Sequence, residues 1–506
     1  MIRPESDQMQ FGRFALTTLV FLVPLAAYGN LILHYFYDIG LFFFDAGWSA
    51  YLIREGDFLL HEPSFVIPAG SENESWFAYH VSPIFLATSA LGHLVPLSRI
   101  QFYALYIGVS HALPGLAVFW LLVSGYGLRK PAPLAAAALL ALLFAFDGMA
   151  MAIARFPHFT MLIVGTGTMF LAALVLQRLR IAALFFVLCI TVREDAGLHL
   201  FALLSLLLVL DRRQGATFWE NRHILTFAAI ALLYAVSAVV LQHVLFRDHS
   251  LLVSEYLGSP LLEGVTLSSM AFRLSGWIVY RSYVFLPALL ACVWAIRRRD
   301  PTIALGYAAF VPWGILHLVA AREAVGSLPS YYAFPFMIAS FWPLAGILHR
   351  RRRFGGTEGS LLEPVAGFAL LTAASLVPAQ YLHNPAGMAF PESFLSLPSL
   401  SREAATDRAL HAFAGSAKLG ATMVDESVVA LAPELYRPDD LLSQAPHRHP
   451  DTIIYFDRGF DGGLARERAA QDGLDRIYAV PGTEIRVATN RNLDGVLGLA
   501  RWGEPR

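Results

Sequence analysis

Long uncharged stretches recur along the chain up to about residue 380. The first is FALTTLVFLVPLAAYGNLIL (14–33), and comparable stretches lie near 101–124, 132–149, 158–177, 181–210, 224–246, 274–296, 303–321, 331–348 and 361–379. A helix of about 20 apolar residues can cross the roughly 30 Å core of a bilayer. The pattern therefore predicts a polytopic all-α membrane domain.

The composition agrees with that prediction. Of 506 residues, 56% are hydrophobic and 15% are charged, whereas a soluble domain is about a quarter charged. The formal net charge of -1 gives no reason to expect a nucleic-acid partner. Cys189 and Cys292 both lie in apolar stretches, which is typical of buried thiols and not of a disulfide framework. No A-x-A-like cleavage site follows the first stretch, so we expect a retained helix.

Basic clusters set the expected orientation. They lie at 129–130, 178–180, 212–213, 297–299 and 350–353. Short basic loops are usually cytoplasmic, and placing all five there requires residues 181–210 to leave and return. Two helices of about 12–14 residues, each roughly 20 Å long, would do so, with TVREDAG (191–197) at the turn. Charge at that depth is tolerated only against protein or a water-filled cavity.

These rules predict about 11 crossings, a cytoplasmic N-terminus and an outer C-terminal region. Residues 82–97 are expected to form only a partial or re-entrant helix. A large first outer loop (35–80) then begins with YDIGLFFFDAGW (37–48). Asp38 and Asp45 are two helical turns apart, so an interfacial helix over 38–53 would turn both carboxylates to one side. The aromatic residues around them suit the headgroup level.

Past about residue 380 the sequence has ordinary soluble composition. Residues 402–416 and 465–473 are predicted helices, and LGATMVD (419–425), DTIIYFD (451–457), DRIYAVPG (475–482) and TEIRVATN (483–490) are predicted strands. We therefore expect a transmembrane domain over 1–380 and a small extracytoplasmic α/β domain over 381–506. It has no Gly-rich nucleotide loop, and His447-Arg448-His449 matches no standard metal site.

Five stretches, in their order, resemble a bacterial membrane-protein family called domain of unknown function 2079. They are YDIGLFFFDAGW (37–48), YHVSPIFL (79–86), RFPHFTM (155–161), VREDAGL (192–198) and PSYYAFPFMIA (329–339). The chain departs from the family twice. The family's acidic-Phe-His stretch is RFPHF here, and the His that usually precedes Tyr in the last stretch is Ser330.

That family in turn resembles the class C glycosyltransferases, polytopic enzymes that use lipid-phosphate-linked sugars. The resemblance implies that Asp38 is the catalytic carboxylate. It also implies a fold and an ancestral chemistry, and it leaves open whether this member is an enzyme that transfers a hexose or pentose.

Such a transfer needs a base for the acceptor proton and cations for the departing phosphate. Asp38 would be the base, with Asp45 as its orienting partner. Arginine suits phosphate because its planar fork bonds two oxygens. The candidate substrate-binding residues are His80, Arg155, His158, Arg193, Glu194, Asp195, Arg273, Tyr331 and Tyr332.

Structural roles stand beside these functional ones. Asp38 would also suit a helix cap, and Glu194 and Asp195 would suit an ion pair with Arg193. Tyr331 and Tyr332 fit an aromatic belt at the membrane surface.

The leading prediction is an integral glycosyltransferase of the bacterial cytoplasmic (inner) membrane. It would transfer a sugar from a polyprenyl-phosphate-linked donor to a cell-envelope glycan, lipid or protein at the outer face. A lipid or sugar transporter or flippase is one alternative, although paired Gly/Pro-broken helices in two halves are not evident. A non-catalytic envelope-assembly scaffold is another. No cofactor is predicted, and a divalent metal is left open.

Overall fold

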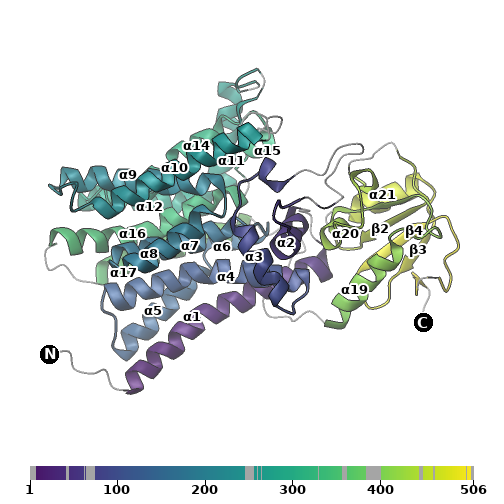
Figure 1. The fold of residues 1–506 in the computed structure, drawn as a ribbon, viewed down its shortest axis with the longest axis horizontal. Coiled ribbons are helices and arrows are strands. Elements are labelled where there is room, and N and C mark those ends of the chain that lie inside the picture. Colours follow the sequence, from purple (N-terminus) through teal and green to yellow (C-terminus); the bar gives the residue numbers. More distant parts are fainter. Residues whose placement is uncertain are drawn as a thin grey trace. The chain divides into compact units, whose positions relative to one another are not determined.

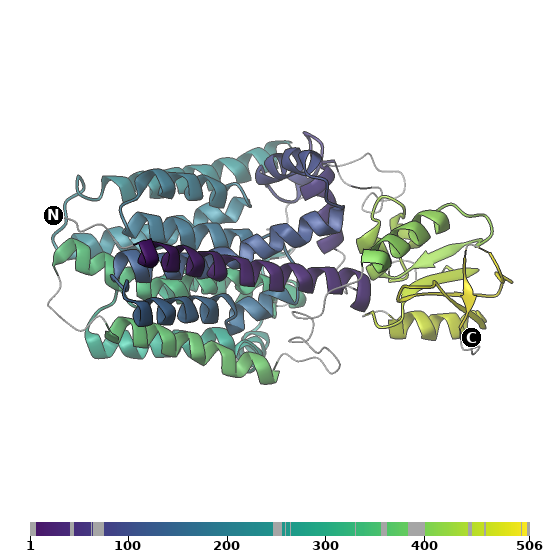
Figure 2. The same ribbon diagram turned by 90° about the horizontal axis from the view of Figure 1, so that it is seen from below.

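The computed structural model describes residues 7–40, 45–61, 63, 75–245, 256–258, 260–263, 265–328, 330–355, 362–382, 400–443, 448–459, 462–496 and 498–502. The chain forms two compact units (Figures 1 and 2). We call Met1–Ala26, Phe77–Ile84 and Ile107–Met388 the helical unit, and Ala27–Trp76, Phe85–Tyr106 and Ala389–Arg506 the mixed unit. The mixed unit thus joins part of the predicted first loop to the C-terminal segment. The predicted domain boundary at 380 stays a prediction.

The helical unit is built from packed helices. They are α5 (Pro131–Ala145), α6 (Gly148–Ala154), α7 (Met161–Val175), α8 (Leu179–Ile190), α9 (Glu194–Arg213), α10 (Arg222–Leu245), α11 (Leu267–Tyr280), α12 (Ser282–Arg298), α13 (Leu305–Ala309), α14 (Val311–Leu318), α15 (Glu323–Gly326), α16 (Phe334–Phe354) and α17 (Leu362–Leu382). The helices α1 (Asp7–His34) and α4 (Arg99–Trp120) belong partly to each unit. Figure 1 shows α9 beside α10 and α7 beside α8, and both pairs are in close contact.

Four described segments are long and apolar enough to cross a membrane. They are Gln10–Ile39, Arg99–Gly125, Arg222–Leu245 and Tyr331–Phe354. Two bent pairs, α5 with α6 and α11 with α12, raise the number to six if each pair is one span. The predicted count of about 11 is therefore not confirmed. The exposed face of α10 carries Leu233, Val236, Val240 and Leu241, which is the surface expected of a helix in contact with lipid.

The break expected within residues 181–210 is confirmed. The first helix, α8, ends at Ile190 and α9 begins at Glu194. The break is shorter than the predicted turn over 191–197, since Glu194 and Asp195 already form the first turn of α9. Residues 82–97 contain only the 11-residue helix α3 (Ile84–Leu94), as expected. The single helix predicted over 274–296 is wrong, because the chain forms two helices there, α11 and α12, which meet at 87°.

The interfacial helix predicted over 38–53 is also wrong. A five-residue π-helix, η1 (Tyr35–Ile39), continues α1, and Gly40 has a φ of +79°. Glycine adopts this conformation without steric cost, and it ends the helix. The next helix, α2, is Asp45–Glu55. Asp38 and Asp45 therefore lie on two helices, and they do not share one helix face.

The C-terminal part of the mixed unit contains a five-stranded sheet of order β1-β2-β4-β3-β5. Its strands are β1 (Thr422–Val424), β2 (Thr452–Phe456), β3 (Arg476–Ala479), β4 (Ile485–Thr489) and β5 (Ala500–Arg501). The pair β1–β2 is parallel and the other pairs are antiparallel. The helices are α19 (Leu400–Phe413), α20 (Glu426–Leu431) and α21 (Gly462–Gln471). The four predicted strands and both predicted helices are confirmed, whereas β5 and α20 were not predicted.

The central strand β2 (TIIYF) is buried along its whole length. Ile453 and Tyr455 pack with Ala465 and Ala469 of α21 on one face of the sheet. Ile454 and Phe456 alternate with them and are also buried, as expected for a strand covered on both faces. Figure 2 shows the sheet between its helices.

A close backbone approach joins α2 to α20 inside the mixed unit. A Cβ atom added to Gly47 would lie 2.2 Å from the backbone oxygen of Ala430. We expect Gly47→Ala to lower the free energy of unfolding by about 1–3 kcal/mol, because the two helices must separate. The measurement is thermal unfolding of the purified chain in detergent. Gly463→Ala is the control, since nothing lies within 4 Å of its Cβ position. Equal melting temperatures for the two variants would contradict the prediction.

Asp407 on α19 makes the stability of the mixed unit depend on pH. Burial, followed by the charge of Glu403, raises the pKa of Asp407 to about 6, against roughly 3.9 in an unfolded chain. A carboxyl group with a higher pKa in the folded state stabilises the fold fully below about pH 4, and this stabilisation is lost as pH rises through 6. Asp407→Asn should therefore melt above the wild type at pH 8, and the gap should narrow by pH 4.5. A gap that does not change with pH would refute this.

Candidate functional site

The break between α8 and α9 positions three charged side chains inside the helical unit. Thr191 accepts a hydrogen bond from the backbone N–H of Ile84 at 3.0 Å through its carbonyl oxygen, which ties the break to the start of α3. Arg193 has extended backbone angles (φ -159°, ψ 152°) and precedes the first turn of α9. Glu194 and Asp195 follow in that turn, where the helix dipole favours carboxylates.

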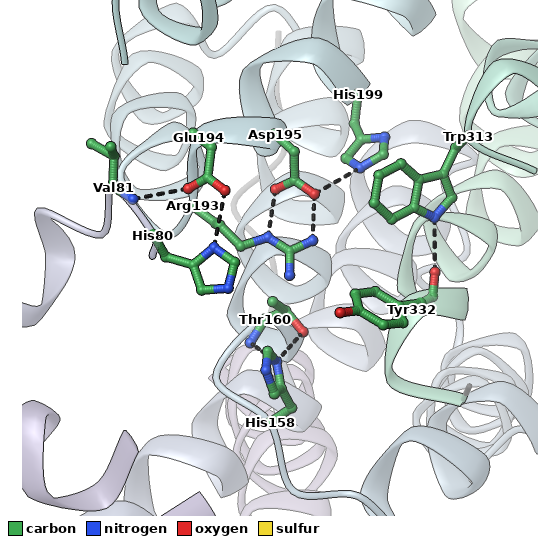
Figure 3. A network of polar contacts seen from close by, with 10 residues as sticks. All are labelled: His80, Val81, His158, Thr160, Arg193, Glu194, Asp195, His199, Trp313 and Tyr332. Carbon is green, nitrogen blue, oxygen red and sulfur yellow. Dashed lines mark hydrogen bonds and ion pairs between the residues drawn. The ribbon is translucent and has the colours of Figure 1, made fainter. Parts of the chain in front are cut away.

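Arg193 and Asp195 form a buried, two-pronged ion pair. Nε of Arg193 donates to Oδ1 of Asp195 at 2.7 Å, and Nη2 donates to Oδ2. The guanidinium carbon also lies 5.3 Å from the ring centre of Phe334, a favourable cation–π distance. Only 3% of Arg193 is exposed. Within the described ranges the third nitrogen, Nη1, makes no hydrogen bond, and Figure 3 shows it on the side of Thr160 and His158.

Glu194 connects this centre to the segment that begins at His80. Its Oε1 lies 3.0 Å from Nδ1 of His80, and its Oε2 accepts the backbone N–H of Val81 at 2.9 Å (Figure 3). The structure therefore brings together four of the residues predicted from sequence: His80, Arg193, Glu194 and Asp195. The role of each stays a prediction.

His158 lies on the other side of the guanidinium. Its Nδ1 is 2.8 Å from Oγ1 of Thr160 and accepts the Thr160 backbone N–H at 3.3 Å. Because Nδ1 accepts a hydrogen bond, the neutral ring carries its proton on Nε2. The ring stacks on Tyr331 at 5.3 Å, and Tyr331 packs against Tyr332 at 4.4 Å. Predicted residues 158, 331 and 332 thus form one aromatic group.

His199 and Trp313 belong to the centre although they were not predicted. Nε2 of His199 lies 3.5 Å from Oδ2 of Asp195, and the His199 ring is edge-on to Trp313 at 4.9 Å. Trp313 donates from Nε1 to the carbonyl oxygen of Tyr332 at 2.9 Å. The spacing of Asp195 and His199, four residues apart on one helix, was the available sequence signal for His199.

The two other predicted arginines have different surroundings. Arg273 donates from Nη1 to the carbonyl oxygens of Leu318 and Ala320, at 2.9 and 2.7 Å. These bonds hold the end of α14. Arg155 is half-buried and follows the last residue of α6. Their predicted contacts with substrate stay predictions.

The predicted base, Asp38, lies in the mixed unit at the end of η1. One carboxylate oxygen, Oδ2, contacts Nδ1 of His34, and the other, Oδ1, accepts a hydrogen bond from Nη1 of Arg402 on α19. The side chain of Asp38 is 16% exposed, that of His34 is 8% exposed and that of Arg402 is 33% exposed. Sequence reasoning missed His34 and Arg402. Only the i, i+4 spacing of His34 and Asp38 signalled the first of them.

Glu403, next to Arg402, docks α19 on the same region. It is buried and accepts hydrogen bonds from Tyr37 Oη (3.4 Å), Ser98 Oγ (2.5 Å) and Gln101 Nε2 (3.0 Å). Arg99 beside them pairs through separate nitrogens with two glutamates, Glu55 and Glu434. Adjacent residues of α19 therefore hold both Asp38 and its neighbour Tyr37.

The chemistry available at these centres is anion binding and proton transfer. Each has a guanidinium, a carboxylate and an imidazole. In the described part of the chain, no group of three or more His, Cys, Asp or Glu side chains is placed to hold a metal ion. Residue 447 of the sequence HRH lies outside the described residues.

Comparisons with known proteins add little. No family model matches the chain, and no curated protein matches it either. The name domain of unknown function 2079 therefore stays a prediction. Among solved structures, the chain is similar to the archaeal oligosaccharyltransferase AglB of Archaeoglobus fulgidus, in complex with an inhibitory peptide and a dolichol-phosphate. The TM-score is 0.38 and the identity 11%, over 99% of this chain and 75% of that one. A likeness this weak shows no function.

The buried ion pair predicts that neutralising two neighbouring carboxylates, Asp195 and Glu194, has very different effects on the free energy of unfolding. Asp195→Asn leaves the Arg193 charge buried without its counter-charge, which typically costs about 3–5 kcal/mol of unfolding free energy. Glu194→Gln keeps an oxygen for the Val81 N–H and should cost clearly less. Chemical or thermal unfolding of both purified variants in detergent measures the difference. An Asp195→Asn variant as stable as Glu194→Gln would show that the pair does not support the fold.

Proposed function

We propose that the chain is a membrane glycosyltransferase with a polyprenyl-phosphate-linked sugar donor and a cell-envelope acceptor. The reaction would take place at the outer face of the bacterial cytoplasmic membrane. The observation that supports the proposal is the placement of Asp38. Its carboxylate lies at the end of an apolar helix and contacts the imidazole of His34 and the guanidinium of Arg402. This set supplies a base for an acceptor hydroxyl and a cation for a phosphate leaving group.

In the proposed step, each bond that breaks or forms and the transferred proton are accounted for. The acceptor O–H bond breaks as its oxygen bonds the anomeric carbon of the sugar, and the proton passes to Asp38. The bond between that carbon and the phosphate oxygen breaks, and its electron pair leaves with the polyprenyl phosphate. A carboxylate within hydrogen-bond reach of the acceptor is enough for the proton transfer.

The buried centre of the helical unit gives independent support for a phosphate ligand. Arg193 is fixed by Asp195 and keeps one nitrogen without a hydrogen bond in the described ranges. A planar guanidinium with an available N–H suits phosphate oxygens. Charged groups retained inside apolar helices usually belong to a functional site. We assign Arg193 a phosphate-binding role, with His80 and His158 as further donors.

Asp38→Asn tests the proposal directly. The variant keeps the shape of the side chain and loses the base, so sugar transfer should fall by about 10²–10⁴-fold, with little change in melting temperature. Transfer is measured with purified protein, labelled polyprenyl-phosphate sugars and envelope fractions as acceptors. The control is Asp57→Asn, an exposed carboxylate of the same unit whose hydrogen bonds in the described ranges are with Leu59 and His61. Wild-type transfer by Asp38→Asn would rule out the assignment.

A further inference from the structure

Arg402 uses only part of its hydrogen-bonding capacity. Its Nη1 holds Oδ1 of Asp38, and no other hydrogen bond of its guanidinium is found in the described ranges. One third of the side chain is exposed. Nε and Nη2 are therefore donors left for a ligand, on a side chain that is partly open to solvent. A guanidinium presents its five N–H groups in a fixed plane, which matches the oxygens of a phosphate.

Asp38, in contrast, has both oxygens engaged. His34 contacts Oδ2, and its side chain is nearly buried; Arg402 contacts Oδ1 from a side chain that is four times as exposed, at 33% against 8%. A base that is to accept a proton from an acceptor hydroxyl must turn one oxygen toward it. Of the two partners, Arg402 is the one that can move, because it is partly exposed and holds Asp38 through a single nitrogen.

We propose that Arg402 is an anion-binding residue that exchanges partners. It holds Asp38 in the resting protein, and it binds the phosphate of an incoming ligand in the working protein, which releases Oδ1 of Asp38 to act as the base. The inference rests on the proposed role of Asp38 and adds a residue and a trigger to it. The ligand is a phosphate ester, either the lipid-linked donor or an acceptor that carries phosphate.

Two physical facts favour such an exchange. A partly exposed ion pair adds little to stability, since water screens it and side-chain entropy opposes it. A two-pronged contact between arginine and phosphate is stronger and more specific. A phosphate can therefore take the guanidinium from a carboxylate that holds it by one nitrogen.

The helix that carries Arg402 does not need to move. Glu403 anchors α19 through Tyr37, Ser98 and Gln101, and it is itself buried. These three bonds are independent of Asp38. The exchange is thus a swing of one long side chain about a fixed backbone, and such rotamer changes are fast compared with enzyme turnover.

The experiment measures phosphate affinity and not transfer. The full chain in detergent is titrated with farnesyl phosphate and, separately, with inorganic phosphate. We expect Asp38→Asn to bind about tenfold more tightly than the wild type, because Arg402 no longer has a charged competitor. Arg402→Gln should bind about tenfold more weakly, Arg402→Lys should fall between, and the double variant Asp38→Asn/Arg402→Gln should show no gain over Arg402→Gln.

Arg491→Gln is the matched control, since Arg491 forms a similarly exposed pair with Asp451 in the same unit. It should leave both affinities unchanged. A gain with farnesyl phosphate alone supports the exchange and identifies the lipid donor, and an equal gain with inorganic phosphate supports it and identifies a soluble anion. An unchanged affinity of Asp38→Asn for both probes, or a gain that persists without Arg402, overturns the inference.

The outcome separates this inference from the proposed function. If Asp38→Asn loses transfer without a gain in phosphate affinity, Asp38 is the base and Arg402 does not exchange. If it gains affinity and still transfers sugar, the exchange exists and the base is another group. The Asp38→Asn arm retains Arg402, so it does not depend on the folding of an Arg402 variant.

Discussion

The interior of the helical unit depends on one constraint, the free-energy cost of removing the guanidinium of Arg193 from water. Burying an uncompensated charge costs several kcal/mol, and only a well-aligned counter-charge offsets it. Arg193 has such a counter-charge because α8 ends at Ile190 and α9 begins at Glu194. This break places the carboxylate of Asp195 against the guanidinium of Arg193. Without the break, residues 190–195 would be continuous helix, and the backbone of Arg193 could not be extended. The break, the ion pair and the contact of Glu194 with His80 therefore depend on one another.

The mixed unit contains the same three groups, an arginine, a carboxylate and a histidine, but its arginine is held less tightly. In both units a carboxylate lies between an arginine and a histidine, and in both the histidine is four residues away on the same stretch of helix. Asp195 is held by two nitrogens of an arginine that is almost fully buried, so its pair is fixed. Asp38 is held by one nitrogen of an arginine that is one third exposed. The first arrangement suits a permanent charge, and the second suits a charge that changes partner.

The sequence predicted these features unequally, and the differences have physical causes. The basic clusters required a break within residues 181–210, and the charges of TVREDAG located it between α8 and α9, since charged residues are costly to bury and rare in an apolar stretch. Local sequence patterns located the strands β1 to β4 and the helices α19 and α21. The single helix over 38–53 failed because a periodic pattern does not reveal the positive φ of Gly40. Arg402 was missed because nothing local in residues 400–413 distinguishes it from other surface arginines. Its partner is 364 residues away, and such pairings come from tertiary structure alone.

That separation also fixes an order of events during synthesis. The carboxylate of Asp38 leaves the ribosome 364 residues before the guanidinium that will pair with it. At about 5–20 residues per second, the interval is roughly 20–70 s. Throughout that time His34, which precedes Asp38 in the chain, has been made and Arg402 has not. A chain that stops short of residue 402 never completes the pair, so the ion pair forms only in a nascent protein whose translation has passed α19. The pairing of Asp38 thus depends on translation having passed residue 402 of the 506-residue chain.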